Sequence, residues 1–302
     1  MSKQMQIMDA PIALGHVVSQ QSHIEAVALK RKYPQFKYRE RVFVDTSPNP
    51  YAASVTFFVQ DQVGKAKFLS GKGDDIPMVD ILKNKFEQGI LDGGVGYSYS
   101  FTEIGQAAMM GTNLSSEGAM VAREAFEFLA DSVAHIGDAA AGVEGLTNTT
   151  GITTVAAAQT FTAATVDQIL TTVNGNMTAI WDGSKGIDMP DTILLPMAQW
   201  GDLATRRMGS GDGSMTVLDY IKAKNVYTAE TGQPVAVQAS HYLTNRMVMY
   251  ANKPEVVKMY MPMPLEFLPP QLRSVYVDVY GVFRFAPVNI RRPGSMRYVT
   301  GV

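Results

Sequence analysis

The sequence contains no cysteine among its 302 residues. This absence excludes disulfide bonds, thiolate metal ligands and cysteine nucleophiles. Histidine is scarce as well, and its four residues are scattered along the chain: His16, His23, His135 and His241. No nucleophile–base pair and no Gly-x-Ser-x-Gly elbow can be identified in what remains. We therefore expect no catalytic residue, no cofactor-binding residue and no metal ligand.

Long apolar runs are also missing. No window approaches the roughly 18 apolar residues that a membrane-spanning helix requires, and Asp9 and Pro11 interrupt the first apolar stretch, so it does not read as a signal peptide. We expect no membrane partner. The chain is 46% hydrophobic, which is ordinary for a globular protein. Its length suits one large domain or two closely associated ones.

Neither sign of charge is in large excess, since the formal net charge is −2. A near-neutral chain is not expected to bind nucleic acid through a strongly basic surface. The charges are nevertheless segregated: residues 30–41 are basic, residues 74–144 are mostly acidic, and the end of the chain is basic again. This pattern suits basic ends that lie on acidic surfaces of the same chain or of a second copy. Solvated faces without a partner fit it equally well.

Two β-forming runs, residues 53–62 and 66–70, flank a turn at Gly64. Their Val, Thr and Phe content predicts a hairpin. An isolated two-stranded hairpin is marginally stable in water. Three phenylalanines in these runs therefore require cover from elsewhere: Phe57, Phe58 and Phe68. Further strands are expected at 78–88 and 94–101, with a bend at the glycines of 93–96.

A long amphipathic helix is predicted over residues 115–138. The apolar face that we expect to be buried consists of Val121, Ala125, Phe128, Leu129, Ser132 and Ile136. Another side of this helix is acidic, with Glu124, Glu127 and Asp131. Because no histidine at helical spacing completes a di-metal motif, we interpret the acidic side as solvated or partner-facing rather than metal-binding.

The second half of the chain mixes helices and strands without a regular βαβ alternation, so the predicted class is α+β. Helices are expected at 165–181, 198–207 and 216–224, and strands at 191–196, 235–239, 246–251, 255–261 and 275–285. The glycine-rich segment Met208–Ser214 lacks the Gly-Lys-Ser/Thr ending of a phosphate loop, and we interpret it as a surface loop.

Four local motifs stand in a characteristic order. They are Ile76-Pro-Met-Val-Asp80, the run from Gly94 to Glu103, the turn Gly142-Val-Glu-Gly-Leu-Thr-Asn-Thr-Thr-Gly-Ile152, and the ending Val288-Asn-Ile-Arg-Arg-Pro-Gly-Ser-Met-Arg-Tyr-Val-Thr-Gly301. Over nearly the whole chain this order resembles the Hong Kong 97-type major capsid proteins of tailed phages, including a major capsid family formerly catalogued as a domain of unknown function. Encapsulins share that fold.

The resemblance implies an N-terminal arm (1–50), an extended β-hairpin loop (51–77), a peripheral domain (78–164) with its spine helix at 115–138, an axial domain (165–264) and returning strands of the peripheral domain (265–302). It implies a structural protein of the virion that is not an enzyme. Copies would self-assemble as pentamers and hexamers into an icosahedral phage head, in the host cytoplasm, around double-stranded DNA that is contacted non-specifically. Portal, scaffolding and decoration proteins are the further partners that it suggests.

Candidate contacts between subunits combine the charged segments with the hairpin: Lys30, Arg31, Lys32, Arg39, Arg41, Phe57, Phe58, Lys65, Phe68, Glu124, Glu127, Asp131, Arg291 and Arg292. Loop lysines could serve isopeptide crosslinking, but no catalytic Glu and acceptor Asn can be located, so crosslinking is not expected. Two alternatives remain open at this point: an encapsulin-like compartment shell, and an α+β enzyme with a loop-borne site near Met208–Ser214.

Overall fold

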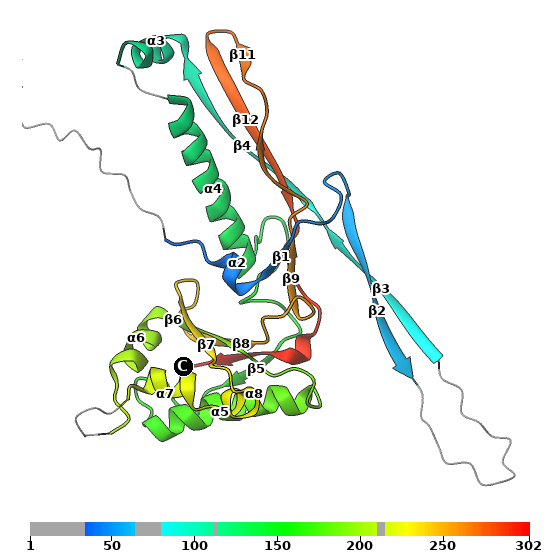
Figure 1. Ribbon diagram of the computed structural model, residues 1–302, viewed down its shortest axis with the longest axis vertical. Helices are drawn as coiled ribbons and strands as arrows, with labels where there is room; N and C mark the ends of the chain where they lie inside the picture. Colours follow the sequence, from blue (N-terminus) through cyan, green and yellow to red (C-terminus); the bar gives the residue numbers. More distant parts are fainter. Residues whose placement is uncertain (1–33, 64–79, 111–113, 210–214) are drawn as a thin grey trace, which may run out of the picture. The chain divides into compact units, whose positions relative to one another are not determined.

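The computed structural model describes residues 34–63, 80–110, 114–209 and 215–302. Residues from Phe36 to Val302 cluster as one unit, which all of the following concerns. In these residues helices and strands are mixed, and the strands form sheets of two, three, four and five members (Figure 1). The predicted α+β class is confirmed.

The five-stranded sheet has the order β5-β14-β8-β6-β7. Its members are β5 (Thr153–Ala156), β6 (Thr192–Pro196), β7 (Ala236–Ser240), β8 (Arg246–Tyr250) and β14 (Met296–Thr300). Four helices accompany it: α5 (Val166–Gly183), α6 (Met197–Thr205), α7 (Val217–Ala223) and α8 (Val226–Thr231). Thr165 and Gln168 close a capping box at the start of α5. Apolar residues of the sheet and helices, including Ile169, Met177 and Leu203, form one buried core.

A second sheet is built on two long antiparallel strands, β4 (Leu91–Ser100) and β12 (Tyr276–Phe285), which pair along their whole length. Two short strands, β10 (Met263–Phe267) and β11 (Gln271–Arg273), also pair with β12. The long helix α4 (Leu114–Ile136) lies alongside this sheet (Figure 1). The expected bend at residues 93–96 is absent, because these glycines lie within β4.

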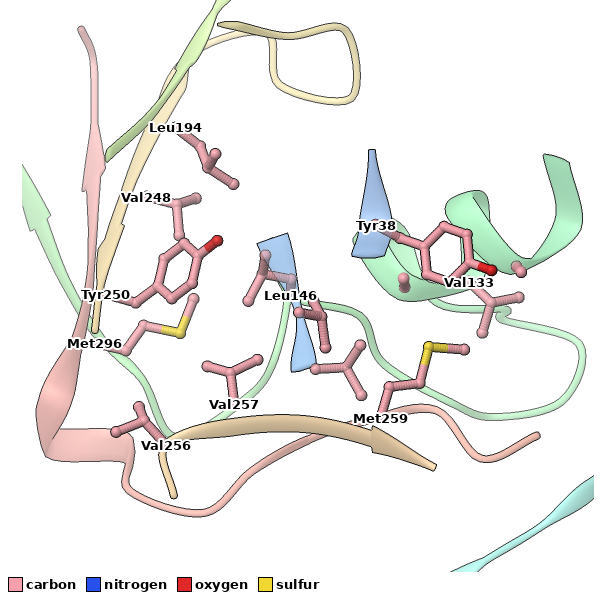
Figure 2. Close-up of a cluster of buried hydrophobic side chains, with 14 of the residues drawn as sticks. Tyr38, Val133, Leu146, Leu194, Val248, Tyr250, Val256, Val257, Met259 and Met296 are labelled. Atoms are coloured by element: carbon pink, nitrogen blue, oxygen red, sulfur yellow. The ribbon is translucent and has the colours of Figure 1, made fainter. Parts of the chain in front are cut away.

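A three-stranded sheet of order β1-β9-β13 contains β1 (Phe43–Asp45), β9 (Val257–Tyr260) and β13 (Val288–Ile290). The short helix α2 (Tyr38–Arg41) precedes β1, and the 3-10 turn η1 (Pro293–Ser295) precedes β14. Side chains from α2, α4, β8 and β9 meet in a shared apolar core (Figure 2). Tyr38, Tyr250 and Met259 are buried there. The segment 36–45 is thus part of the folded unit.

The hairpin differs from its prediction. Strand β2 (Ser54–Val63) pairs with β3 (Asp80–Gly89), so its partner is the strand expected at 78–88. The predicted strand at 66–70 and its turn at Gly64 lie outside the described residues. Ten consecutive pairs, from Ser54–Gly89 to Val63–Asp80, tie β2 to β3. The glycine turn made the nearest β-forming run seem the natural partner of β2. The more distant strand β3 pairs with all ten residues of β2.

The long helix is confirmed, but its buried face was predicted wrongly. The side that packs in the core carries Ala122, Phe126, Ala130, Val133 and Ala134. On the side that we expected to be buried, Val121, Leu129 and Ile136 are exposed. Apolar residues occupy more than one stripe of this helix, so periodicity alone does not select the stripe that meets the sheet.

Other elements were not predicted. A helix, α3 (Phe101–Met110), follows β4 directly, and α8, β10 and β11 were missed. At the C-terminal end, we assigned residues 265–302 to the peripheral strands. In the structure β10, β11 and β12 belong to the four-stranded sheet that contains β4, whereas β14 lies inside the five-stranded sheet between β5 and β8. Its pattern of buried residues suits this central position.

Candidate assembly surfaces

The β2–β3 hairpin leaves apolar side chains uncovered. Because strand residues alternate between faces, the paired register places Phe57, Val59, Leu82 and Phe86 on one face. Val59, Leu82 and Phe86 are exposed by 42%, 52% and 49%. Phe58, on the other face, is exposed by 62%. A two-stranded ribbon with this composition requires additional cover for stability.

The base of the hairpin is held by its own chain. The Arg291 guanidinium lies 4.8 Å from the centre of the Phe57 ring, and Phe57 stacks on Phe86 at 5.6 Å. Beside them, Nδ2 of Asn289 donates a hydrogen bond to Oε1 of Gln88 at 2.8 Å. Arg291 also donates to the Tyr260 hydroxyl. Asn289 of β13 and Arg291, which follows this strand, therefore anchor the hairpin through an amide hydrogen bond and a cation–π contact.

Helix α4 presents a second uncovered apolar stripe, on the side that carries Val121, Ala125 and Leu129. Met120 and Ile136 extend the exposed apolar surface toward the two ends of the helix. A helix with apolar residues on most of its circumference is typical of a fully buried element. Within the described subunit only one side of α4 is covered, which indicates a further contact.

A third apolar patch lies where α3 meets the turn between β11 and β12. The backbone N–H of Phe101 donates to the Val275 carbonyl at 3.1 Å, so the two segments are adjacent. The exposed side chains here are Phe101, Met109, Leu272, Val275 and Tyr276. Such a cluster on a single chain is typical of an interaction surface.

The face of the β4–β12 sheet opposite Phe283 forms an open groove of about 770 Å³. The side chains that line the groove on β4 are small: Gly94, Gly96 and Ser98. Those on β12, such as Tyr280 and Val282, are larger. The Asp278 carboxylate is buried there and accepts a hydrogen bond from the Tyr280 hydroxyl at 2.9 Å. The small floor leaves the strand backbone accessible to a second chain.

Some of the charged residues predicted as contacts are exposed in the subunit, and others are buried. Arg39, whose side chain is 60% exposed, pairs with Glu127 of α4 at 3.0 Å, and the Tyr38 hydroxyl donates to the same carboxylate at 2.8 Å. Glu124 is exposed. Asp131, which we expected on a solvated or partner-facing side, is buried instead. Its Oδ1 accepts from the backbone N–H groups of Lys37 and Tyr38, each at 2.9 Å.

Arg41 is also buried, at 2% exposure. Its guanidinium contacts His135 of α4 at 2.9 Å and donates to the Ala239 carbonyl at 2.7 Å. Arg41 and Asp131 are thus placed inside the subunit, where α2 meets α4 and the end of β7. Sequence spacing did not indicate that Arg41 joins this cluster, because Arg41 is 94 residues from His135 and 198 residues from Ala239.

The basic C-terminal region is also paired within the chain. Arg292 lies 3.0 Å from Oδ2 of Asp188 and 3.4 Å from Glu255. Burial raises the pKa of Asp188. The hydrogen bond from Ser295 and the charge of Arg292 lower it by more, so the pKa lies below its usual value. These pairs connect the segment before β14 to the loop that follows α5.

Several predicted residues cannot be placed. Lys30, Arg31, Lys32, Lys65 and Phe68 lie outside the described residues, as do residues 210–214 of the glycine-rich loop. Across the parts of the chain that are described, no three His, Asp or Glu side chains gather into a group able to hold a metal ion. No helix in those same parts is both long and apolar enough to span a bilayer.

The fold matches solved capsid structures. The capsid of Myoviridae phage XM1 aligns with a TM-score of 0.80 and 17% identity, covering 99% of this chain and 100% of that one. The capsid of the empty GTA particle aligns at 0.64 and 12%, covering 99% of each chain. Microbacterium phage Oxtober96 aligns at 0.64 and 12%, covering 96% and 99%. These matches show that the chain has the fold of capsid shell proteins.

Comparison with protein families then gives the family. Residues 64–302 match the family described as major capsid protein, and the chain belongs to that family. No curated protein sequence matches the chain. The resemblance to phage major capsid proteins is confirmed, and the encapsulin-like alternative is not better supported. The protein is a major capsid protein, a structural component of a capsid shell, with the fold of phage capsid proteins.

Sequence reasoning missed the groove and the α3 patch. A signal for the groove was available, since glycine alternates with valine and tyrosine along Gly94–Tyr99. Such alternation predicts a strand with one small face. No comparable signal marked α3, whose ten residues carry one charge, Glu103.

Proposed function

We propose that copies of this chain associate through the β2–β3 hairpin, as pentamers and hexamers, into a closed icosahedral head around double-stranded DNA. The supporting observation is the exposed apolar face of Val59, Leu82 and Phe86, on a hairpin that Arg291 contacts at Phe57. Covering this face with a neighbouring subunit removes apolar area from water, worth about 25 cal/mol per Å². Repetition over many subunits makes a durable shell from modest contacts.

We assign the roles of the segments in the same proposal. Residues 1–50 are the N-terminal arm. The extended loop, which the sequence placed at 51–77, also includes β3, because β3 pairs with β2 along its whole length. The rest of 78–164, with α4 as its spine helix, forms the peripheral domain. The axial domain is 165–264, and 265–302 return to the peripheral strands, apart from β14. The exposed stripe of α4 and the patch at α3 are further surfaces for contact between subunits.

Of the charged candidates, Arg39 and Glu124 are accessible for contacts with a neighbour. Lys30, Arg31 and Lys32 remain proposed contacts of the arm, and Lys65 and Phe68 of the loop. Arg41, Glu127, Asp131, Arg291 and Arg292 act first within the subunit, where their side chains shape the surfaces that carry the exposed groups.

The DNA contact in this proposal is non-specific and weak for each subunit. The net charge is −2, and Arg284 and Arg292 are paired with acidic groups of their own subunit. We further propose assembly in the host cytoplasm, with portal, scaffolding and decoration proteins as separate partners and without enzymatic activity.

Electron microscopy of the purified protein tests the proposal. Closed particles are expected, and the nucleic acid that copurifies with particles from infected cells should be double-stranded DNA. Empty compartments that retain a protein cargo would favour the encapsulin-like alternative. A monomer that forms no particles, with or without a scaffolding protein, would contradict the proposal.

A further inference from the structure

A cluster of buried polar side chains joins the root of the N-terminal arm to the rest of the subunit. It consists of Arg41 on α2, Asp131 and His135 on α4, and Ser240 at the end of β7. Arg41, Asp131, His135 and Ser240 are each 2% exposed or less. None of the contacts between subunits proposed above uses this cluster.

The two ring nitrogens of His135 have different partners. Nδ1 lies 2.7 Å from the backbone carbonyl oxygen of Asp131, which can only accept, so Nδ1 carries the hydrogen. Nε2 lies 2.9 Å from Nη1 of Arg41, which can only donate, so Nε2 must offer its lone pair. The geometry therefore requires the neutral ring with its hydrogen on Nδ1.

Arg41 is held from several elements at once. Its Nε donates to Oε1 of Gln238 at 3.0 Å, its Nη1 also reaches the Ser240 hydroxyl at 3.2 Å, and its Nη2 donates to the Ala239 carbonyl at 2.7 Å. The Tyr250 hydroxyl donates to the Arg41 backbone carbonyl at 2.8 Å. Arg41 consequently ties α2 to α4 and β7 through its side chain, and to β8 through its backbone carbonyl.

Asp131 completes the attachment. Oδ1 accepts the backbone N–H groups of Lys37 and Tyr38, and Oδ2 accepts the Tyr242 hydroxyl at 2.9 Å. The Tyr242 ring stacks on His135 with centres 4.7 Å apart. A single carboxylate thus holds the start of α2 and the segment after β7.

The charged and titratable groups around His135 act in opposite directions. Burial lowers the pKa of His135 most strongly, and Arg41 and His241 lower it further, while Asp131 raises it. Burial lowers the pKa of Arg41, whereas the neighbouring Glu40 and Tyr250 both act to raise it. Protonation of His135 would place an N–H donor and a positive charge against the Arg41 guanidinium.

We propose that Arg41, Asp131 and His135 form an arm lock, which holds the root of the N-terminal arm against α4 and β7 only while His135 is neutral. When His135 accepts a proton on Nε2, the Arg41–His135 hydrogen bond is lost and the two cations repel. The segment 37–42 is then released from Asp131 and β7. The lock acts within the subunit and stands independently of the proposed shell geometry.

Hydrogen–deuterium exchange of the full-length protein tests the lock between pH 7.5 and 4.5, with light scattering to confirm a constant assembly state. Exchange is corrected for its intrinsic pH dependence with an unfolded peptide of the same sequence. The amides of residues 37–42 should exchange faster as the pH falls, approaching about tenfold per pH unit below the pKa of an exposed histidine. The amides of α5 serve as the internal control and should not change.

The variant His135→Gln should keep an acceptor for Arg41 without titrating, so its exchange at 37–42 should stay flat across the series. His241→Gln is the matched control, because His241 is exposed and packs on Tyr242. It acts on His135 only as a nearby charge, so exchange at 37–42 should still rise as the pH falls in this variant. The lock is refuted if wild-type exchange at 37–42 is independent of pH, or rises only together with α5. If His135→Gln does not fold, the wild-type series decides alone.

Discussion

The ring of Phe126 on α4 lies 4.8 Å from the ring of Phe283 on β12, and Gly93 of β4 makes this contact possible. A Cβ at position 93 would lie 2.1 Å from the Phe283 ring, far inside van der Waals contact. Helix and sheet are therefore joined through one aromatic pair over a glycine, and the outward face of α4 is the one that remains uncovered.

Phe126→Ala should lower the free energy of unfolding of the dissociated subunit by about 3–5 kcal/mol, because it removes a buried ring and leaves a cavity. Denaturant titration followed by circular dichroism measures the change. Val121→Ala, on the exposed stripe of the same helix, is the control and should change stability by less than about 0.5 kcal/mol. Equal effects of the two variants would show that the packing of α4 has been assigned to the wrong side.

Leu82→Asp and Phe86→Asp should abolish or strongly reduce particle formation, since each places a charge on the hairpin face that we propose a neighbour covers. Burial of such a side chain contributes roughly 1.5–3 kcal/mol per contact. Sedimentation velocity and electron microscopy give the readout. Leu82→Met retains the apolar area and should assemble normally. Wild-type yields of particles from both aspartate variants would exclude this face from assembly.

Arg291→Ala should loosen the base of the hairpin, because it removes the cation that lies over Phe57 and the hydrogen bond to Tyr260. The cation–π contact is worth about 0.5–2 kcal/mol. Faster hydrogen–deuterium exchange in residues 54–60 and 82–89 is the expected result. Arg291→Lys keeps the charge but not the planar stacking, so its effect should be intermediate. Unchanged exchange in the alanine variant would place the anchor elsewhere.

The ion pair between Asp45 of β1 and Lys258 of β9 should make the subunit sensitive to acid. Burial raises the pKa of Asp45, but hydrogen bonds from Lys258 and Ser47 outweigh it and lower the pKa to about 2. A carboxyl group with a depressed pKa stabilises the fold above its unfolded value, and this contribution disappears as the pH falls from about 3.8 toward 2. Stability measured across this window should decline.

Asp45→Asn should remove this part of the decline. Asp92→Asn is the control, because the Asp92 carboxylate is 75% exposed and its pair with Arg284 is weakened by water. Identical acid profiles for the wild type and Asp45→Asn would show that the pair does not contribute.

Much of the local structure could be predicted from the sequence, because its signals are local. The helix 115–138, the helix that begins at Thr165 and the strand at 191–196 follow from capping residues, periodicity and a short apolar run. The order of four motifs indicated the capsid family. The partner of β2 could not be predicted in this way, because a strand with free hydrogen-bonding groups accepts more than one neighbour.

The site was less predictable than the fold. Of the phenylalanines expected to need cover from outside the hairpin, Phe58 is exposed in the subunit, whereas Arg291 of the same chain lies over Phe57. Asp131 was expected on an open side of the helix, yet it is buried against α2, because a carboxylate that accepts two backbone N–H groups and a hydroxyl can be accommodated inside a protein. The sequence shows that a residue is charged, but not which distant backbone groups will form hydrogen bonds with it.

The α+β class, the spine helix, the uneven charge and the absence of cysteine chemistry all follow from the amino-acid sequence, since each depends on residue identity or on neighbours within a few turns. The covered stripe of α4, the pairing of β3 with β2 and the contact between Arg41 and His135 follow from the folded structure. Those choices depend on packing between segments far apart in the chain, where shape and hydrogen-bond satisfaction select among arrangements that local preference leaves equivalent.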